Sequence, residues 1–406
     1  MERVLTVSFV DKAKEDLEMA NHTTILINDT VTQGQTLLME SPRPQLLQTR
    51  YFPTDNVTDV FDSKKVMLDF DNGDLQSGAF FQKGYGDGSK TTFYSEVCEP
   101  PRIAESDIVD AGDRDRVLFE QLCRAQGNAT PSHADALNDL LRIKAGRCAD
   151  RVQRGIERLC SMLLQKNALA LQYKSSPTAS TNDVTVDVQY FNDETTGAAA
   201  DGGKNPQVYE SKAWGGADAT PYDDVCAMCR KLVQNGGNAV DLLMSPQMWG
   251  HLIADITKKM GNGMPQINYT IINSGDKGGL YDSDILDAQH VGSANFGGYV
   301  LNLIVYSGAY TTIETNKEVF KPYLPENFVC VIAPNVGHTL CGAVNKASVG
   351  AFVNGGDAAL VRHTGKFIVT KYFDFANEQV SVRCESLPLP APYRRWGWVT
   401  KTDSAG

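Results

Sequence analysis

Long apolar runs are missing from this 406-residue sequence. The longest candidate is Tyr299–Tyr306, which Asn302 interrupts, whereas a membrane-spanning helix needs about 18 or more apolar residues in a row. The N-terminus, MERVLTVSFVDK, also lacks the basic flank, long apolar region and small-residue cleavage site of a signal peptide. The sequence therefore predicts a cytoplasmic product with no membrane partner.

Positive charge is also in short supply. There are 38 Lys and Arg against 49 Asp and Glu, a formal net charge of −11. This balance argues against binding of a nucleic-acid backbone over the whole surface, although it leaves a local basic patch open. With 42% hydrophobic and 21% charged residues the chain is too apolar to be disordered. Its length suggests two or three domains, or one discontinuous architecture of that size.

Signatures of catalysis and cofactor binding are absent as well. The six histidines are scattered, and there is no H-E-x-x-H zinc motif, G-x-S-x-G serine elbow or phosphate-binding loop ending in Lys-Ser/Thr. We therefore predict no catalytic residue, no cofactor and no metal ion.

The nine cysteines form no dense paired framework, which favours reduced, buried thiols. Cys226 and Cys229 have redox-motif spacing, but they fall inside a predicted helix rather than at its N-terminus, where a thiolate would be stabilised. Buried small side chains are the preferred interpretation, and a thiol enzyme is the alternative. Cys330 and Cys341, with His338 between them, are poorly spaced for a structural zinc site.

The first hundred residues read as an arm followed by a hairpin. Residues 1–50 are polar and weakly patterned, and two strand-like runs at 65–70 and 91–97 flank a Gly- and Asp-rich tip. Between Asp55 and Glu96 there are eight acidic residues and four lysines, a net charge of −4. Few of these residues could form a core, so we expect the hairpin to lean on something else.

One long amphipathic helix is predicted from Ser132 to about residue 165, after a shorter helix at 113–124. Apolar residues recur along the long helix every three or four positions. They are Leu137, Leu141, Ala145, Cys148, Val152, Ile156, Leu159 and Leu163. Four arginines fall within a narrow arc beside this stripe, namely Arg147, Arg151, Arg154 and Arg158, and we call them the arginine ridge. The ridge should be exposed or paired.

Beyond residue 168 the pattern changes. Alternation at 183–191 predicts a strand that opens a second region. Two helices follow, one introduced by Thr220 and Pro221 and ended by Gly236, the other introduced by Ser245 and ended by Gly261. Later strands are predicted at 299–313, 327–332, 366–375 and 379–383, before a Pro-punctuated tail.

Several passages, taken together and in order, resemble one known family. In the first half they are RPQLLQTRYFP (43–53), VMLDFDNGDLQSGAFF (66–81), EPPRIAESDIV (99–109) and the long helix with Arg151 and Arg154. In the second half they are the Trp-Gly stretch at 214–216, TPYDDVCAMCRKLV (220–233), DLLMSPQMWGHLI (241–253), PYLPENFVCVIAP (322–334) and SLPLPAPYRR (386–395). The most specific is the passage with Met244, Ser245, Pro246 and Trp249. The sequence resembles the lambda-type major capsid proteins of tailed bacteriophages, which have the Hong Kong 97-type capsid fold.

This resemblance implies an α+β fold and a division of the chain. The expected parts are an N-terminal arm (1–50), an E-loop hairpin (51–104), a peripheral domain with the spine helix (105–182), an axial domain (183–344) and strands returning to the peripheral domain (345–406). It implies a structural protein, not an enzyme, that forms hexamers and pentamers of an icosahedral virion shell around double-stranded DNA. Scaffolding, portal and decoration proteins are the implied partners, and the host bacterial cytoplasm the place of assembly. An encapsulin-like nanocompartment shell is the alternative.

Charge suggests a contact between subunits. The helix from 132 to 165 carries six basic and four acidic residues, a net charge of +2, against −4 for the hairpin. We predict that Asp69, Asp71 and Asp74 of one subunit meet Arg147, Arg151 and Arg154 of a neighbour. The alternative is that the ridge is solvated, or paired within its own helix through Asp150 and Glu157.

Overall fold

The computed structural model describes residues 43–55, 57–71, 93–109, 112–113, 115–116, 133–173, 184–190, 208–261, 269–271, 285, 287–314, 317–347, 360–363, 365–374, 379–394 and 396–402. Most of the predicted arm, the hairpin tip at 72–92 and most of the predicted helix at 113–124 lie outside these ranges. No helix in the described part is long and apolar enough to span a bilayer.

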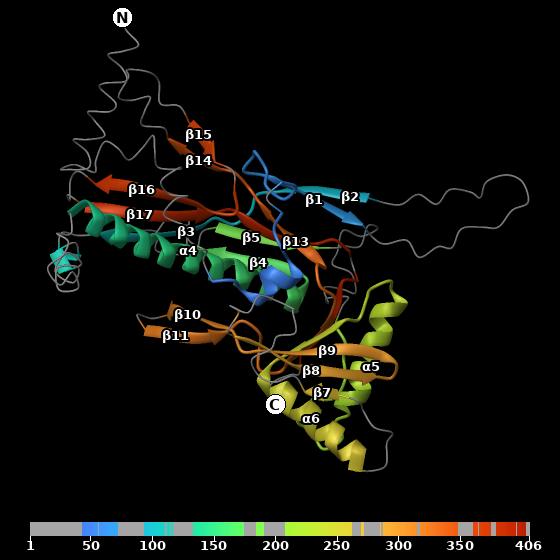
Figure 1. Cartoon of the computed structure of the whole chain (residues 1–406). Coiled ribbons are helices and arrows are strands. Elements are labelled where there is room, and N and C mark those ends of the chain that lie inside the picture. Colours follow the sequence, from blue (N-terminus) through green and yellow to red (C-terminus); the bar gives the residue numbers. More distant parts are fainter. Residues whose placement is uncertain are drawn as a thin grey trace, which may run out of the picture.

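The predicted long helix is confirmed as α4 (His133–Lys166), 34 residues in length. The stripe residues with described side chains are all buried, from Leu141 to Leu163. The strands β17 (Gln379–Ser386) and β3 (Ile103–Val109) pack along the helix. They belong to one antiparallel sheet in the order β16 (Ile368–Asp374), β17, β3. At the end of α4 the chain turns into an antiparallel hairpin of β4 (Ala168–Tyr173) and β5 (Val184–Gln189). These elements form the upper part of the molecule in Figure 1.

A six-stranded sheet forms the second structural layer. Its order is β19 (Trp398–Thr402), β12 (Phe328–Ile332), β6 (Asp241–Met244), β9 (Tyr299–Tyr306), β8 (Ala288–Phe296), β7 (Tyr269–Ile271). All neighbours in the sheet are antiparallel except β6 and β9. The helices α5 (Pro221–Gln234) and α6 (Pro246–Gly261) lie beside this sheet, at the lower right of Figure 1.

The central strands of this sheet are buried on both faces, and alternate residues belong to two different cores. Leu243, Cys330 and Ile304 join the core that contains α4. Leu242 and Val331 point to the other side, into the core formed with α5 and α6. Because successive side chains of a strand point to opposite faces, one sheet can separate and connect two cores. This explains why these strands are apolar runs rather than alternating patterns.

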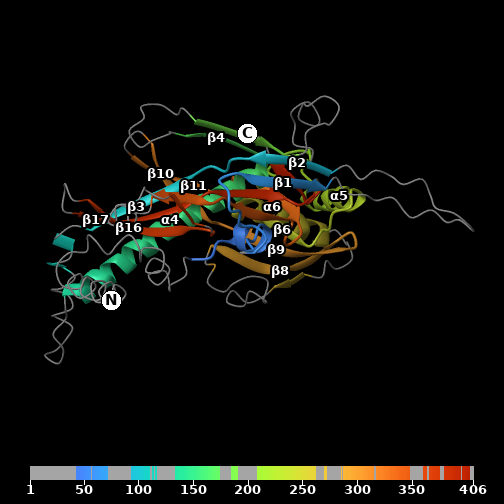
Figure 2. The ribbon, with the colours of Figure 1, turned by 90° about the horizontal axis from the view of Figure 1, so that it is seen from above.

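Four further two-stranded antiparallel sheets complete the described part of the fold. The paired strands are β1 (Val66–Asp71) with β2 (Phe93–Cys98), β10 (Ala309–Glu314) with β11 (Lys317–Pro322), β13 (Gly337–Cys341) with β18 (Pro388–Pro392), and β14 (Val344–Ala347) with β15 (Leu360–His363). The predicted N-terminal hairpin is thereby confirmed at its base. Its two strands lie at the upper right of Figure 1, and Figure 2 shows them from above.

Strand pairing differs from the predicted division in two places. β5 pairs with β4, so it extends the α4 layer instead of opening a second region at residue 183. β19 pairs with β12 in the six-stranded sheet, so the final residues do not all return to the peripheral strands. In both cases the apolar residues of a short strand are buried against another strand. The alternation of apolar and polar residues predicts that a strand forms, but it does not predict which strand it pairs with.

Two local predictions are also corrected. The predicted strand at 299–313 is divided into β9 and β10 by Ser307 and Gly308. At position 308 any side chain would overlap the Tyr306 ring, so this break requires glycine. The Pro-punctuated tail forms β18, which pairs with β13. Its prolines occupy alternate positions, so Leu389 and Ala391 between them keep the N–H groups that a ladder with one neighbour requires.

Candidate assembly surfaces

A short segment before the hairpin is fixed to the long helix by a buried carboxylate. The π-helical turn η1 (Leu47–Tyr51) directs two backbone N–H groups at Glu157 of α4. Leu47 N donates to one carboxylate oxygen at 2.8 Å and Gln48 N to the other at 3.1 Å. Tyr306 of β9 donates its hydroxyl to the same carboxylate at 2.8 Å. Glu157 therefore joins the segment, the helix and the six-stranded sheet.

Burial sets the acidity of this group. Glu157 is fully buried, and loss of hydration raises its pKa above the ordinary value of 4.5, although donors from Leu47, Tyr306 and Gln48 oppose the shift. Its nearest aromatic neighbours respond in the same direction. Burial and the Glu157 charge raise the pKa of Tyr306 well above its usual value.

A second buried carboxylate holds the other end of η1. Arg50 forms a two-pronged ion pair with Asp241, the first residue of β6, through contacts of 2.6 and 2.9 Å. The side chains are 7% and 0% exposed. Asp241 also accepts from Asn302 at 2.9 Å and from the Tyr51 hydroxyl at 3.3 Å. Burial acts to lower the pKa of Arg50, but the ion pair outweighs it and the pKa is raised.

The arginine ridge is exposed along α4, as predicted. Arg151 pairs with Glu105 of β3 at 3.6 Å, and Arg158 lies over the Tyr310 ring at 5.2 Å. Glu157 is not a partner of the ridge, because its carboxylate is turned inwards to η1, so that part of the alternative is wrong. Asp150 accepts the backbone N–H of Arg43 at 3.1 Å.

The predicted acidic partners lie on the projecting hairpin. Asp69 and Asp71 are on β1, and Asp74 lies outside the described residues. In Figure 1 the base of this hairpin lies at the upper right, whereas the N-terminal end of α4 lies at the left. Arg151 and Arg154 lie in the C-terminal half of α4.

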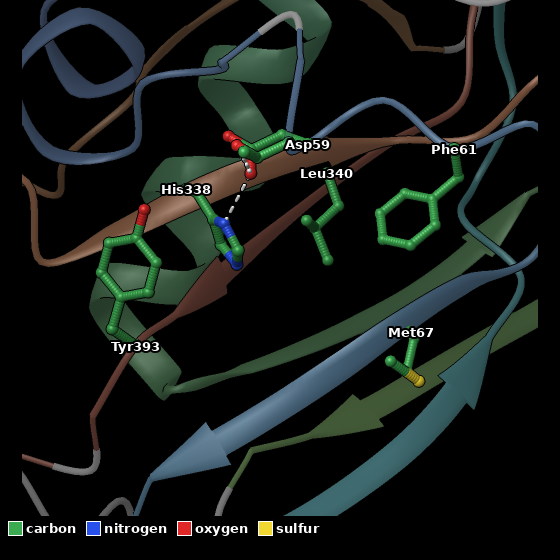
Figure 3. A pocket seen from close by; sticks show the side chains of 7 residues that line it. Asp59, Phe61, Met67, His338, Leu340 and Tyr393 are labelled. Atoms are coloured by element: carbon green, nitrogen blue, oxygen red, sulfur yellow. Dashed lines mark hydrogen bonds and ion pairs between the residues drawn. The ribbon is translucent and has the colours of Figure 1, made fainter.

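A pocket of ≈ 290 Å³ lies at the foot of this hairpin (Figure 3). Thr58, Asp59, His338 and Tyr393 form its polar wall, and the apolar wall consists of Phe61, Met67 and Leu340. His338 Nδ1 lies 2.9 Å from Asp59 Oδ1, and its ring packs on Tyr393 with centroids 4.5 Å apart. We call this the hairpin-foot pocket.

The cysteines have the environment of core residues. Burial raises the pKa of Cys229 to about 12, and burial also raises the pKa of Cys226. A reactive thiol needs the opposite shift. Among the described residues no group of three or more His, Cys, Asp or Glu is placed to hold a metal ion, and His338 instead pairs with Asp59.

Comparison with known proteins identifies the family. A sequence model described as phage major capsid protein E matches residues 29–402. The chain belongs to this family of phage major capsid proteins. It is therefore a structural subunit of a virion capsid that associates with copies of itself into shells, and it is not an enzyme. No curated protein sequence matches.

Solved structures of capsid and encapsulin proteins are similar to this chain over most of its length. A capsid protein assigned to a prophage of E. coli CFT073 is 15% identical, with a TM-score of 0.51 over 92% of this chain and 93% of that one. The capsid of Ralstonia phage GP4 gives 10% identity and a TM-score of 0.41, over 91% and 93% of the two chains. An encapsulin complex of Synechococcus elongatus PCC 7942 gives 10% identity and a TM-score of 0.37, over 96% of this chain and 94% of that one. The capsid protein has the α+β Hong Kong 97-type fold.

The Arg50–Asp241 pair predicts a large effect on stability. In Asp241→Asn the guanidinium of Arg50 stays buried without its counter-charge, so the free energy of unfolding should fall by about 3–5 kcal/mol. The matched control is Asp218→Asn, which removes the exposed pair with Lys212 and should cost about 1 kcal/mol or less. Denaturant unfolding of dissociated subunits measures both. Equal losses in the two variants would contradict the structural role of the buried pair.

Glu157 predicts a pH dependence. The pKa of Glu157 is raised in the folded subunit, so the folded state binds the proton more tightly than the unfolded state does. The contribution of this group to the free energy of unfolding is therefore largest below about pH 4.5 and is lost as pH rises through the folded-state pKa. The stability of the native protein minus that of Glu157→Gln should therefore decrease as pH rises above about 4.5. Tyr306→Phe keeps the carboxyl group and should retain the decrease. Unfolding curves measured across this pH range test it, and a constant difference would show that Glu157 does not titrate as proposed.

Proposed function

We propose that this capsid protein forms hexamers and pentamers that close into an icosahedral head around double-stranded DNA. The observation that carries the proposal is an exposed apolar face on the β1–β2 hairpin, which includes Met67 and Val97. The chain that carries this face belongs to a family of capsid proteins. Such an element needs a neighbouring surface to cover it. A ring or shell of identical copies supplies that surface.

The proposal includes the chain's partners and its parts. Scaffolding, portal and decoration proteins would be separate chains, assembly would take place in the host cytoplasm, and DNA would be held without sequence preference. The net charge of −11 supports a shell that encloses DNA without binding it tightly, because an acidic inner surface would repel the phosphate groups of the DNA. The predicted arm, E-loop, peripheral and axial parts are kept, with the peripheral part extended through β5 and the axial sheet completed by β19.

Electron microscopy of the purified protein tests this function. Negatively stained particles should be closed shells of uniform size, formed either by the chain alone or with its scaffolding partner. A protein that stays monomeric at high concentration, with its assembly partners present, would contradict the proposal.

The contact between hairpin acids and the arginine ridge also belongs to the proposed function. Its support is the opposite net charge of the hairpin and of the long helix. Arg147 and Arg154 are the better partners, since both are exposed and Arg151 already contacts Glu105. Complementary charges of this kind direct subunits into the right register.

Charge reversal tests the contact. Asp71→Lys and Arg147→Glu should each reduce the yield of shells several-fold, because each places like charges together, and the double variant should recover most of the yield. Lys166→Glu, which changes an exposed charge at the end of the same helix, is the matched control and should assemble normally. A double variant that assembles no better than either single variant would exclude this pairing.

A further inference from the structure

The hairpin-foot pocket has an apolar opening. Met67 of β1, which lines the pocket, is 48% exposed, and Tyr393 on the opposite wall is 45% exposed. Val97, the cross-strand partner of Met67, and Val57 are also exposed. Exposed apolar side chains gathered around a cavity are typical of a surface that another molecule covers.

The carboxylate of the polar wall, Asp59, already has several hydrogen-bond partners. Asp59 accepts hydrogen bonds from Asp55 N at 2.8 Å and from the Thr58 hydroxyl at 3.2 Å, and it pairs with His338 at 2.9 Å. A charged occupant would have to compete with these partners. The open space lies beside Phe61, Met67 and Leu340, as Figure 3 shows, so the pocket suits an apolar or aromatic group.

Among the described residues, Phe320 is a suitable aromatic group on another surface. Phe320 of β11 is 70% exposed. Among the described residues, the exposed large hydrophobic side chains include two aromatic ones, Phe320 and Tyr393. Its hairpin is firmly held. Tyr310 of β10 packs on Tyr323 with ring centroids 5.2 Å apart, and the carbonyl of Tyr323 accepts a hydrogen bond from Gln165 of α4 at 3.0 Å. Phe320 is therefore presented on a rigid support.

We propose that Phe320 of one subunit inserts into the hairpin-foot pocket of a second copy. Within one chain β10–β11 and β1–β2 lie on different sides of α4, and they are also apart when seen from above, so a chain does not fill its own pocket (Figures 1 and 2). A contact between two different surfaces of the same chain is head-to-tail, the kind that closes into rings. The inference rests on the proposed assembly into shells.

Charges beside the two surfaces support the pairing. Glu318 lies two residues before Phe320 on β11, so both are on its exposed face. Lys65 lies two residues before Met67 and is likewise exposed. Docking of Phe320 beside Met67 brings an acid and a base to the same rim, the arrangement expected around a buried anchor.

Site-directed cross-linking tests the contact in assembled shells. Met67→Cys and Phe320→Cys are combined, and a bismaleimide that spans the two replaced side chains is added. We expect covalent dimers and higher multimers in denaturing gels. Each single variant reports the background from the native cysteines. Phe320→Cys with Val300→Cys is the matched control, because Val300 is 64% exposed but lies on β9, away from the pocket.

Replacement of the aromatic group gives a second readout. Phe320→Ala should fold as the native chain does, since the ring is exposed in the subunit, but its shells should dissociate at a lower temperature. Phe320→Leu should recover part of the loss. Shells that form and dissociate normally in Phe320→Ala, with no cross-link above the controls, would overturn the inference alone. Failure of the native protein to form any shell would instead overturn the proposed function.

Discussion

Two buried carboxylates connect the parts of this capsid protein. Glu157 receives the N–H groups of η1 on the helix layer, and Asp241 receives Arg50 on the sheet layer. Buried charge is costly unless it is paired and hydrogen-bonded, and each carboxylate meets this condition through the same five-residue turn. The turn consequently has one position relative to α4 and β6. The chain entering from the N-terminal side and the hairpin leaving at residue 66 both start from that position.

The sheet that this turn contacts has no solvent face at its centre. Its alternate residues complete one core with α4 and another with α5 and α6. The two cores are thus coupled through a shared layer, whereas β1–β2 and β10–β11 form separate two-stranded sheets at other places on the molecule (Figure 1). A subunit built in this way has a stiff body and projecting hairpins. In the proposed shell, the body would set the shape of the subunit and the hairpins would cover neighbouring subunits.

Periodicity revealed those elements whose pattern is local. The spine helix was predictable because its stripe repeats over 34 residues, and the base of the hairpin because two β-rich runs flank a Gly- and Asp-rich tip. Glu157 was missed as an anchor, although a signal exists. Gln153, Glu157 and Ser161 form a polar row at four-residue spacing beside the stripe, and all three are buried. An acidic residue flanked by apolar residues on the buried face of a helix indicates a hydrogen-bonding partner elsewhere in the core.

The sequence by itself determined the long helix, the exposed arginine ridge, the acidic hairpin and, through the order of its motifs, the capsid family. These features depend on residues close together in the chain, where period and composition suffice. Only the tertiary structure decided that Arg50 pairs with Asp241 and that a pocket lies at the foot of the hairpin. It also decided that β5 pairs with β4 next to the long helix and that β19 pairs with β12 in the six-stranded sheet. Each of these joins segments far apart in sequence, and such pairings follow from how surfaces are buried against one another, which no local pattern encodes.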